Sequence, residues 1–502
     1  RYKVMDANTI RIETRDSIRI KLTAIQGPKP EDNRWYKIAQ SAARVAMMVR
    51  NVSVTYKNTY AMSISGFRPE IGDMLGQTKG ASGFAPGLDF AFGMTGDSYI
   101  NKALDNGWLV SDSVVSPATT NAQEDLQIRM TLEPVRDLKI DLNAGRTRNK
   151  SNQIQFMYEG MPQIQSGNFN MTVITIGSAF ERRSASNGYS SSSFNRFLGN
   201  LDIIKNRIEN MYAGVPYQGQ SGLNQQPLYQ VNKYSSDVMI PAFLAAYTGR
   251  SASNSALDLF PGILSMMPNW RVTYSGLSKL EFFKKYFKSV TLNHAYRSTY
   301  SVGSYSTFQN FHSYMGDWGF VDDIQTGIPV PSSMYDVSAV SINEQFSPLL
   351  GVDVTFKNGI TTKVEYKTTR ILNLSLAANQ IVESSTKDFV LGMGYKIMGL
   401  ELFPGRNKKD SKNKISNDLA LRMDVSFRNQ SALARDIQQV TTQATSGNKA
   451  LKISFSADYT LSRLLSVSFY YDRQKNTPLV SASSYPVTSA DFGMRLKFSL
   501  TR

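Results

Sequence analysis

Strict alternation of apolar and polar residues over long segments is the feature that most constrains the fold of this chain. Residues 418–428 read DLALRMDVSFR, with an apolar side chain at every odd position, and residues 451–461 and 491–501 follow the same pattern. Successive side chains of a β-strand point to opposite faces, whereas a helix with about 3.6 residues per turn cannot sort residues in this way. We therefore predict strands that have one apolar and one polar face.

The length of these segments separates two kinds of β-protein. Strands of soluble sheets are most often about 5–6 residues long, whereas the segment 418–428 extends over roughly 36 Å at about 3.3 Å per residue. Tilted by about 45°, such a strand matches the roughly 25 Å apolar band of an outer-membrane barrel. The predicted fold class is all-β, a transmembrane antiparallel β-barrel with short helical segments in its loops. A large soluble β-sandwich or solenoid is the alternative, because alternation is equally normal there.

The alternation also assigns side chains to the two faces of the predicted barrel wall, with apolar residues toward lipid and ionic residues toward a hydrated lumen. The residues predicted to face lipid are Leu419, Leu421, Met423, Val425, Phe427, Ile453, Phe455, Phe492, Leu496 and Phe498. The residues predicted to face the lumen are Arg129, Asp141, Arg422, Asp424, Arg428, Lys452, Asp458, Arg495 and Lys497. The aromatic residues predicted to lie near strand ends, where interfacial girdles occur, are Tyr470, Tyr471, Phe427, Tyr459 and Trp270.

The predicted organisation of the chain follows the distribution of strand and loop signals, with roughly 14–18 strands in total. The segments are 1–50 (a strand and helix that enter the barrel), 51–182 (barrel strands with a Gly-rich loop at 66–98), 183–268 (a long loop or helical insertion), 269–346 (barrel strands with a basic–aromatic turn and a loop) and 347–502 (carboxy-terminal barrel hairpins).

Helical spacing interrupts the strand pattern in three places. In residues 194–212 apolar side chains recur at helical spacing, and we predict a helix packed on a loop or on the lumen wall. Residues 35–50 and 277–289 are predicted to form shorter helices or turns. Among the segments predicted to be strands are 169–181 and 371–382, and Asn358-Gly359 between alternating runs predicts a hairpin.

Composition removes several classes of function. The chain has no cysteine, which excludes disulfides, thiolate metal sites and cysteine nucleophiles within it. It has two histidines, His294 and His312, and no G-x-S-x-G nucleophile motif. The glycine-rich stretch 72–93 lacks the G-K-[ST] ending of a phosphate-binding loop. We predict that the chain is not an enzyme and holds no metal or other cofactor. An outer-membrane protease or lipase is the enzyme alternative.

The chain is basic, with 56 Lys and Arg against 40 Asp and Glu and a net charge of +16. The charges are spread along the predicted strands and alternate with aspartate, whereas a nucleic-acid binder gathers them on one face with stacking aromatics. We therefore predict no nucleic-acid partner, and a solvated loop at 405–414. The longest apolar run, 239–247, is shorter than the about 20 residues of a membrane-spanning helix. Because the chain begins at Arg1, we expect a processed protein or one piece of a longer polypeptide.

Several stretches resemble the SprA/Sov proteins of Bacteroidota, which are outer-membrane translocons of the type IX secretion system. The longest lie at 269–304 (NWRVTYSGLSKLEFFKKYFKSVTLNHAYRSTYSVGS) and 347–395, which contains SPLLGVDVTFKNGITTKVEYKTTRILNLSLAANQ and DFVLGMGYK. Shorter ones are FRPEIGDMLGQ (67–77), FAPGLDFAFG (84–93), NGWLV (106–110), LEPVRDLKIDL (132–142) and DVMIPAFLAAY (237–247). They follow one another in order through nearly the whole chain. The final residues, FSLTR, differ from the terminal aromatic that is common in outer-membrane barrels.

The resemblance implies that the chain is the carboxy-terminal part of a very large barrel in the outer membrane of a Gram-negative bacterium, through which folded cargo proteins leave the periplasm. The partners that it implies are the remainder of the same barrel chain, a PorV-type shuttle subunit, a periplasmic plug protein, secreted cargo proteins and outer-membrane lipid. It transfers no catalytic residue to this sequence. An outer-membrane uptake or adhesin barrel that binds ligand through the loop 183–268 is the alternative.

Overall fold

The structure of the chain is a computed structural model that divides into two units, Arg1–Val49 and Arg50–Arg502. In the first unit, β1 (Tyr2–Val4) and β2 (Ile10–Ile12) form an antiparallel pair. Of the segment 35–50, predicted as a helix or turn, residues 38, 40, 47 and 48 are described as helical, whereas residues 49 and 50 already belong to β3 (Val49–Ser63). The residues that the structure describes are 2–5, 10–13, 38, 40, 47–70, 72, 75–80, 83–96, 98–110, 116–156, 163–181, 183–213, 215, 230–323, 327–400, 418–461, 465–480 and 485–498. The predicted loop at 405–414 lies outside them.

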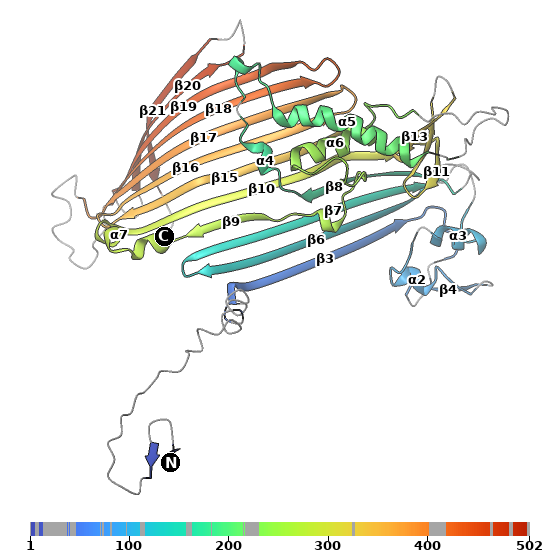
Figure 1. Ribbon diagram of the computed structural model, residues 1–502, viewed down its shortest axis with the longest axis horizontal. Helices are drawn as coiled ribbons and strands as arrows, with labels where there is room; N and C mark the ends of the chain where they lie inside the picture. Colours follow the sequence, from blue (N-terminus) through green and yellow to red (C-terminus); the bar gives the residue numbers. More distant parts are fainter. Residues whose placement is uncertain are drawn as a thin grey trace. The chain divides into compact units, whose positions relative to one another are not determined.

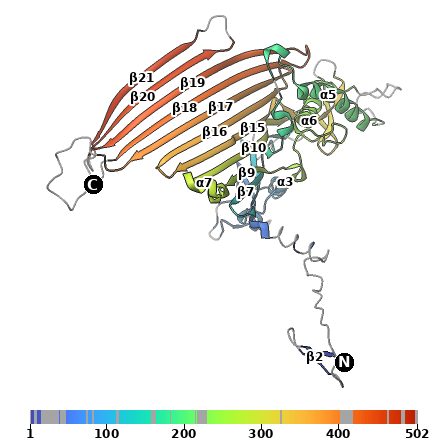
Figure 2. The same ribbon diagram turned by 60° about the vertical axis from the view of Figure 1, so that its left-hand side comes forward.

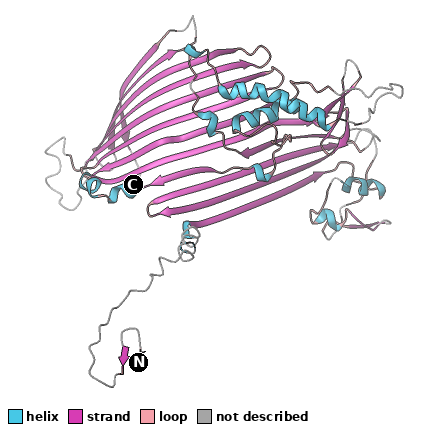
Figure 3. Ribbon diagram, in the orientation of Figure 1, coloured by secondary structure: helices cyan, strands magenta, loops and turns pink. Residues whose placement is uncertain are grey.

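A 14-stranded antiparallel sheet dominates the second unit (Figure 1). From one edge to the other the strands follow the order β21-β20-β19-β18-β17-β16-β15-β10-β8-β7-β6-β3, while β14 pairs with β10, and β9 pairs with β10 and β7. The predicted fold class is confirmed, because the chain is an all-β protein whose long antiparallel sheet is of the kind that forms an outer-membrane barrel wall, with short helical segments in its connections (Figure 3). The strand bounds are β3 (Val49–Ser63), β6 (Ala118–Val135), β7 (Leu138–Ile154), β8 (Ile164–Thr172), β9 (Asn269–Tyr274), β10 (Phe287–Thr307), β14 (Tyr335–Val337), β15 (Ala339–Phe356), β16 (Ile360–Ser375), β17 (Gln380–Ile397), β18 (Leu419–Asp436), β19 (Thr442–Thr460), β20 (Leu465–Pro478) and β21 (Val487–Phe498).

The strands from β15 to β21 form a meander in which sequence neighbours are also spatial neighbours (Figure 2). The predicted hairpin at Asn358-Gly359 is confirmed, and Gly359 has a φ of 88°, a left-handed conformation that glycine adopts without strain. The prediction of a single strand at 371–382 is wrong, because β16 ends at Ser375 and the chain turns before β17 begins. Both strands carry apolar residues on each side of this turn, so their alternation continues across it in the sequence.

Two segments share one strand position between β7 and β10. β8 pairs with β10 at Thr172 and Thr299, and β9 continues along the same side of β10 from the pair of Trp270 with Tyr296. Both segments also pair with β7, so they lie end to end in one row. Residues 173–268, which we call the insertion, leave the sheet between them. The strand predicted at 169–181 therefore ends at Thr172, and the insertion begins earlier than the predicted residue 183.

Two long helices of the insertion pack on the sheet (Figure 1). α5 begins where the hydroxyl of Ser191 accepts a hydrogen bond from the N–H of Phe194. Its buried Phe197 shares one core with Phe243 of α6 and with Ile342 of β15. Within the described residues, no helix combines the length and the apolar character needed to cross a bilayer. The helical elements of the insertion are α4 (Ile176–Ala179), η2 (Ala185–Asn187), α5 (Ser192–Met211), α6 (Ser236–Thr248) and η3 (Ile263–Ser265).

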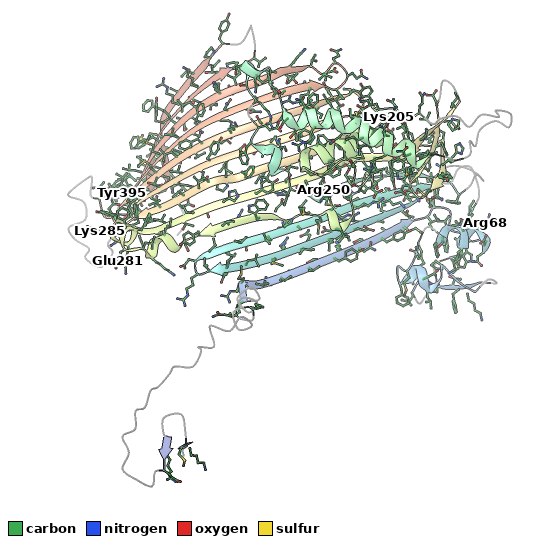
Figure 4. The ribbon with its side chains drawn as sticks, in the orientation of Figure 1. Arg68, Lys205, Arg250, Glu281, Lys285 and Tyr395 are labelled. Atoms are coloured by element: carbon green, nitrogen blue, oxygen red, sulfur yellow. The ribbon has the colours of Figure 1, made fainter. Side chains whose placement is uncertain are left out.

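Smaller groups of elements lie at the ends of the sheet. Between β3 and β6, the region predicted as a Gly-rich loop packs around a separate core that includes Ile100 and Trp108. Between β10 and β14, a three-stranded sheet contributes Phe320 to the core of the insertion. The predicted basic–aromatic turn forms η4 and α7, and Figure 4 shows its Glu281 and Lys285 at the same end of the sheet as Tyr395. The bounds are β4 (Thr78–Gly80), β5 (Gly83–Ala85), α2 (Leu88–Ala91), α3 (Ser98–Asp105), β11 (Phe311–Met315), β12 (Trp318–Asp322), β13 (Pro329–Ser333), η4 (Gly276–Lys279) and α7 (Glu281–Tyr286).

Candidate functional site

The register of the strand pairs divides the side chains of the main sheet into two faces. Leu421 of β18 lies opposite Tyr395 of β17 and Ala457 of β19, and we call the face that these residues share face A. The next residue, Arg422, points to the other side of the sheet, which we call face B. Because the side-chain period of a strand is two, every paired residue of the sheet can be assigned to one face by its register.

The structure brings the two predicted sets of residues onto opposite faces. Face A holds Leu419, Leu421, Met423, Val425, Phe427, Ile453, Phe455, Phe492, Leu496 and Phe498. Face B holds Arg129, Asp141, Arg422, Asp424, Arg428, Lys452, Asp458, Arg495 and Lys497. The contact of face A with lipid and of face B with a lumen stays a prediction.

Apolar residues on face A of β17–β21 form a band, which on β18 covers residues 419–427. About nine residues at about 3.3 Å extend roughly 30 Å, and a tilt of about 40° reduces the height to roughly 23 Å. Large side chains of the band are exposed, including Phe427 at 45% and Phe492 at 84%. The band covers only part of each strand. On β18 it ends at residue 427, whereas the strand continues to Asp436.

Aromatic residues lie at both borders of the band, but the predicted girdle is only partly of this kind. Tyr471 and Phe427 lie at one border and Tyr459 at the other, all on face A. Tyr470 is on face B, because it pairs with Ser456. Trp270 stacks on Tyr296, with ring centroids 4.5 Å apart, well inside the sheet. The girdle prediction is therefore wrong for Tyr470, because its register places it on the polar face. Trp270 lies near the start of β9 as predicted, but it is covered by the neighbouring strands β7 and β10.

Face B carries charges of both signs that pair both across neighbouring strands and along one strand. Arg428 donates two hydrogen bonds, of 2.8 and 3.2 Å, to the carboxylate of Asp388 directly opposite. Lys363 and Lys367 lie 3.0 and 2.9 Å from the carboxylate oxygens of Glu365. The basic partners, Lys363, Lys367 and Arg428, are 35–58% exposed, so these pairs contribute little to stability, but they make a polar surface that suits contact with water.

Face A carries a buried group of charges beyond the band, under the insertion. Arg370 of β16 lies 2.7 Å from Glu344 of β15, and Arg435 of β18 lies 3.1 Å from Glu383 of β17. All four side chains are at most 4% exposed. The sequence analysis did not find them. The sequence does contain a pattern that could have indicated them. Each of these charged residues is two positions from an apolar residue on the same face of its strand, as Glu344 is from Ile342.

The same charges hold the insertion against the sheet. Arg370 donates to the carbonyl oxygen of Ser178 at 2.6 Å and to its hydroxyl at 2.7 Å. Arg435 donates to the carbonyl oxygen of Tyr189 at 2.8 Å, and Arg183 lies 2.6 Å from Glu383. We call Arg183, Glu344, Arg370, Glu383 and Arg435 the clamp. The clamp places the insertion on face A, whereas the helix at 194–212 was predicted to pack on a loop or on the lumen wall.

Two acidic side chains of the insertion organise its helices. Burial alone would raise the pKa of Glu181, but hydrogen bonds from the hydroxyls of Ser191, Ser193 and Ser192 and from the N–H of Ser193 lower it to about 2. These bonds tie the carboxylate to the first turn of α5, where negative charge is favourable. Asp237 at the start of α6 accepts hydrogen bonds from the N–H and hydroxyl of Ser333, at 2.9 and 2.5 Å, and its burial raises its pKa.

The cavities along the described part of the second unit include one between helices and strands, one under the insertion and one on face B. One of about 270 Å³, between the insertion and β12–β14, is lined by Arg148, Asp237 and Asp317 among others. A second, of about 230 Å³, lies between residues 179–189 of the insertion and face A of β16–β18. A third, of about 340 Å³, is a hollow on face B where Gly392 has no side chain.

The histidines form no catalytic group with a nucleophile among the described residues. Nδ1 of His294 lies 2.6 Å from the carbonyl oxygen of Leu349, and Nε2 of His312 lies 3.2 Å from Asp322. Within the described ranges there is also no cluster of three or more His, Asp or Glu side chains able to hold a metal ion. The main sheet is a wall with one apolar and one charged face.

Comparisons with known proteins add little to this geometry. No protein-family model and no curated protein matches the chain. Among solved structures, it is similar to the β-domain of the Bordetella autotransporter BrkA, with 5% identity and a TM-score of 0.21 over 76% of this chain and 92% of that chain. It is also similar to the trimeric outer-membrane protein OmpT of Vibrio cholerae, with 8% identity and a TM-score of 0.20 over 89% of this chain and 99% of that chain.

Proposed function

We propose that this chain forms part of the wall of an outer-membrane β-barrel, with face A against lipid and face B toward a water-filled lumen. The observation that carries the proposal is the apolar band of face A, whose height of roughly 23 Å is close to the roughly 25 Å apolar band of such barrels. Directly behind the band, face B holds charges such as Arg422 and Asp424. A bilayer on one side and water on the other is the environment in which both faces are solvated favourably.

The edges of the sheet support a barrel larger than this chain. β3 and β21 are the outermost strands of the described sheet, and each pairs on one side only. Backbone groups of an open edge cannot remain unpaired in hydrocarbon, so a membrane barrel must continue beyond both strands. The strands that continue it would be the remainder of the same barrel chain. Since barrel diameter grows with strand number, the completed lumen would be wider than that of a barrel made by these strands alone.

We further propose that the completed barrel is the protein-conducting channel of type IX secretion, which passes folded cargo proteins from the periplasm to the cell surface. Its support is the sequence resemblance to the SprA/Sov family together with the open edges, since folded cargo requires a wide lumen. A PorV-type shuttle subunit and a periplasmic plug protein would be the partners at the two sides of the channel. The position of the insertion does not favour the alternative of ligand uptake, because it packs on face A and not over the lumen face.

Cysteine labelling of neighbouring positions tests the face assignment, since the chain itself has no cysteine. Ser456 faces B and Ala457 faces A on β19. In intact membranes, a water-soluble maleimide should label an S456C variant and leave an A457C variant unlabelled. Equal labelling of the two variants would show that face A is not in lipid.

Secretion by the same variants tests the transport function. Attachment of a bulky maleimide–polyethylene glycol to S456C should reduce the cargo that reaches the cell surface and leave it in the periplasm. The A457C variant under the same treatment is the matched control and should secrete normally. Normal secretion by a fully labelled S456C variant, or by cells that lack residues 418–498, would contradict a role in the conducting channel.

A further inference from the structure

Charged side chains that are exposed on face A of β17–β21 are all basic. Three of them follow the last apolar residue of the band on their own strands: on face A, Lys387 follows Phe389 on β17, Lys449 follows Leu451 on β19, and Arg473 follows Tyr471 on β20. On β20 the apolar residues end earlier than on β19, so Arg473 lies opposite Ile453. Lys475 is the next residue of face A on β20. We call Lys387, Lys449, Arg473 and Lys475 the basic collar.

The acids that could neutralise the basic collar are not on its face. On the described parts of β15–β21, the acidic residues of face A are Glu344 and Glu383, and both are buried in the clamp. Other acids of these strands, such as Asp388 and Asp472, point to face B. Among the described residues, no ion pair joins the collar to a carboxylate. Face B carries both acidic and basic side chains, whereas the exposed charged side chains of face A on these strands are all basic.

A cavity meets the collar at Lys387. This cavity, of about 230 Å³, is also lined by Arg183 of the insertion and by the polar side chains of Thr368, Ser385 and Asn429. The Nε atoms of Arg183 and of Arg370, which also lines it, are buried and have no hydrogen-bond partner. The carboxylate among the lining residues, Glu181, is engaged by the serines at the start of α5.

These donors suit a phosphate group. Ionised donors make short, charge-assisted hydrogen bonds to phosphate oxygens, and hydroxyl and amide groups add neutral ones. The border of an apolar band is the level of lipid headgroups, and basic residues there attract anionic lipid. Phe389 and Phe427, exposed by 43% and 45% just inside the border, lie where the acyl chains of the same lipid would pass.

We propose that the basic collar binds the phosphate groups of an anionic outer-membrane lipid, and that the cavity beside Lys387 seats one of them. The proposal rests on the membrane location proposed above. The lipid-binding site would then lie on the outer wall of the barrel, beside residues 179–189 of the insertion and on the opposite face from the lumen. A bound phosphate group would occupy the cavity between residues 179–189 of the insertion and face A.

The test is lipid titration of the full-length polypeptide in neutral detergent, with bound lipid counted by native mass spectrometry. The probes are phosphatidylglycerol, the neutral lipid phosphatidylcholine, and inorganic phosphate alone. Wild-type protein should bind phosphatidylglycerol at least tenfold more tightly than phosphatidylcholine, and inorganic phosphate should not compete at equal concentration. The variant K387Q/K449Q/R473Q/K475Q should lose this preference, and K387Q alone should weaken it roughly fivefold at low salt, as about 1 kcal/mol per basic residue implies.

The matched control is R422Q/K452Q/R495Q/K497Q, which removes the same charge from face B. It should keep the lipid preference of the wild type. Equal preference in the collar variant and the control, or competition by inorganic phosphate that abolishes lipid binding, would overturn the lipid assignment. The proposed membrane location is tested by a separate measurement, the amount of wild-type protein in the outer-membrane fraction. Absence of the protein from that fraction would contradict the location, and the lipid titration does not depend on it.

Discussion

Arg370 and Glu344 form an ion pair of 2.7 Å across β16 and β15, with side chains that are 4% and 2% exposed. Both lie on the face that carries the apolar band, so the same surface is apolar and exposed along one half and charged and covered along the other. A buried pair of this kind is no strong source of stability in itself, because desolvation offsets its attraction. Its consequence is that the insertion has to stay in place, since its removal would uncover both charges.

Removal of one partner from this pair should be far more harmful than removal of a partner from an exposed pair. Glu344→Ala leaves Arg370 buried without its carboxylate, which we expect to cost about 3–5 kcal/mol. The readout is limited proteolysis of the insertion in isolated membranes, which should become much faster. The control is Asp418→Asn, which breaks a pair with the 56% exposed Lys396 and should cost less than about 1 kcal/mol. Comparable proteolysis of the two variants would contradict the role of the clamp.

A basic residue in the apolar band should impair insertion of the barrel into the membrane. Met423 lies near the middle of the band on β18 and is 41% exposed. Met423→Arg is expected to cost about 2–4 kcal/mol, the penalty for Arg on the lipid face near the bilayer midplane. Ser426→Arg, on face B of the same strand, should be tolerated. The measurement is the amount of heat-modifiable protein in the outer-membrane fraction, and an equal loss in both variants would argue against lipid contact by face A.

The sequence allowed the strands of the carboxy-terminal half to be predicted, because each has one apolar side that repeats with period two. It also allowed the face of each predicted charge to be assigned, since parity alone decides the face. The insertion was harder. Residues 239–247 are apolar on all sides, so they show no helical periodicity, and α6 was not predicted. In the structure nearly all of its residues from Val238 to Tyr247 are buried, which explains this composition. The clamp was missed because pairing of Glu344 with Arg370 depends on the register between strands, which the sequence does not reveal.

Truncation of an aromatic side chain in the insertion should loosen the insertion and leave the membrane wall intact. Phe197 of α5 is fully buried and packs near Phe194 and Phe243, with ring centroids 6.2 and 6.4 Å away. Phe197→Ala should cost about 3–5 kcal/mol, whereas Ile203→Ala on the same helix, at a 40% exposed position, should cost little. Faster proteolysis within 173–268, with an unchanged amount of protein in the membrane, is the expected result. Loss of the protein from the membrane would instead show that the wall depends on the core of the insertion.

Acid should loosen the insertion through Glu181. The pKa of this carboxyl is lowered in the folded protein to about 2 from an ordinary 4.5, so its ionised form is favoured by folding. A group with a depressed pKa stabilises the fold fully above its unfolded value, and the contribution is lost as pH falls from 4.5 toward about 2. One pKa unit corresponds to about 1.4 kcal/mol, so the contribution at neutral pH is at most on the order of 3 kcal/mol, and less where solvent screens the half-buried carboxylate.

The expected result is a rate of insertion opening that rises in wild-type protein between pH 5 and about pH 2.5, the window in which the lowered pKa acts. The measurement is hydrogen exchange of α5 amides, corrected for the intrinsic pH dependence of exchange. Glu181→Gln should open faster at pH 7 and show a smaller pH dependence than the wild type, since its amide keeps hydrogen bonding to the serines but does not titrate. Asp202→Asn, at a 63% exposed position paired with Lys233, serves as the control for general loss of negative charge on α5. If the Glu181→Gln variant showed the same pH dependence as the wild type, the acid response would belong to other carboxylates. The hydrogen bonds between Glu181 and the serines would then not be what holds the start of α5.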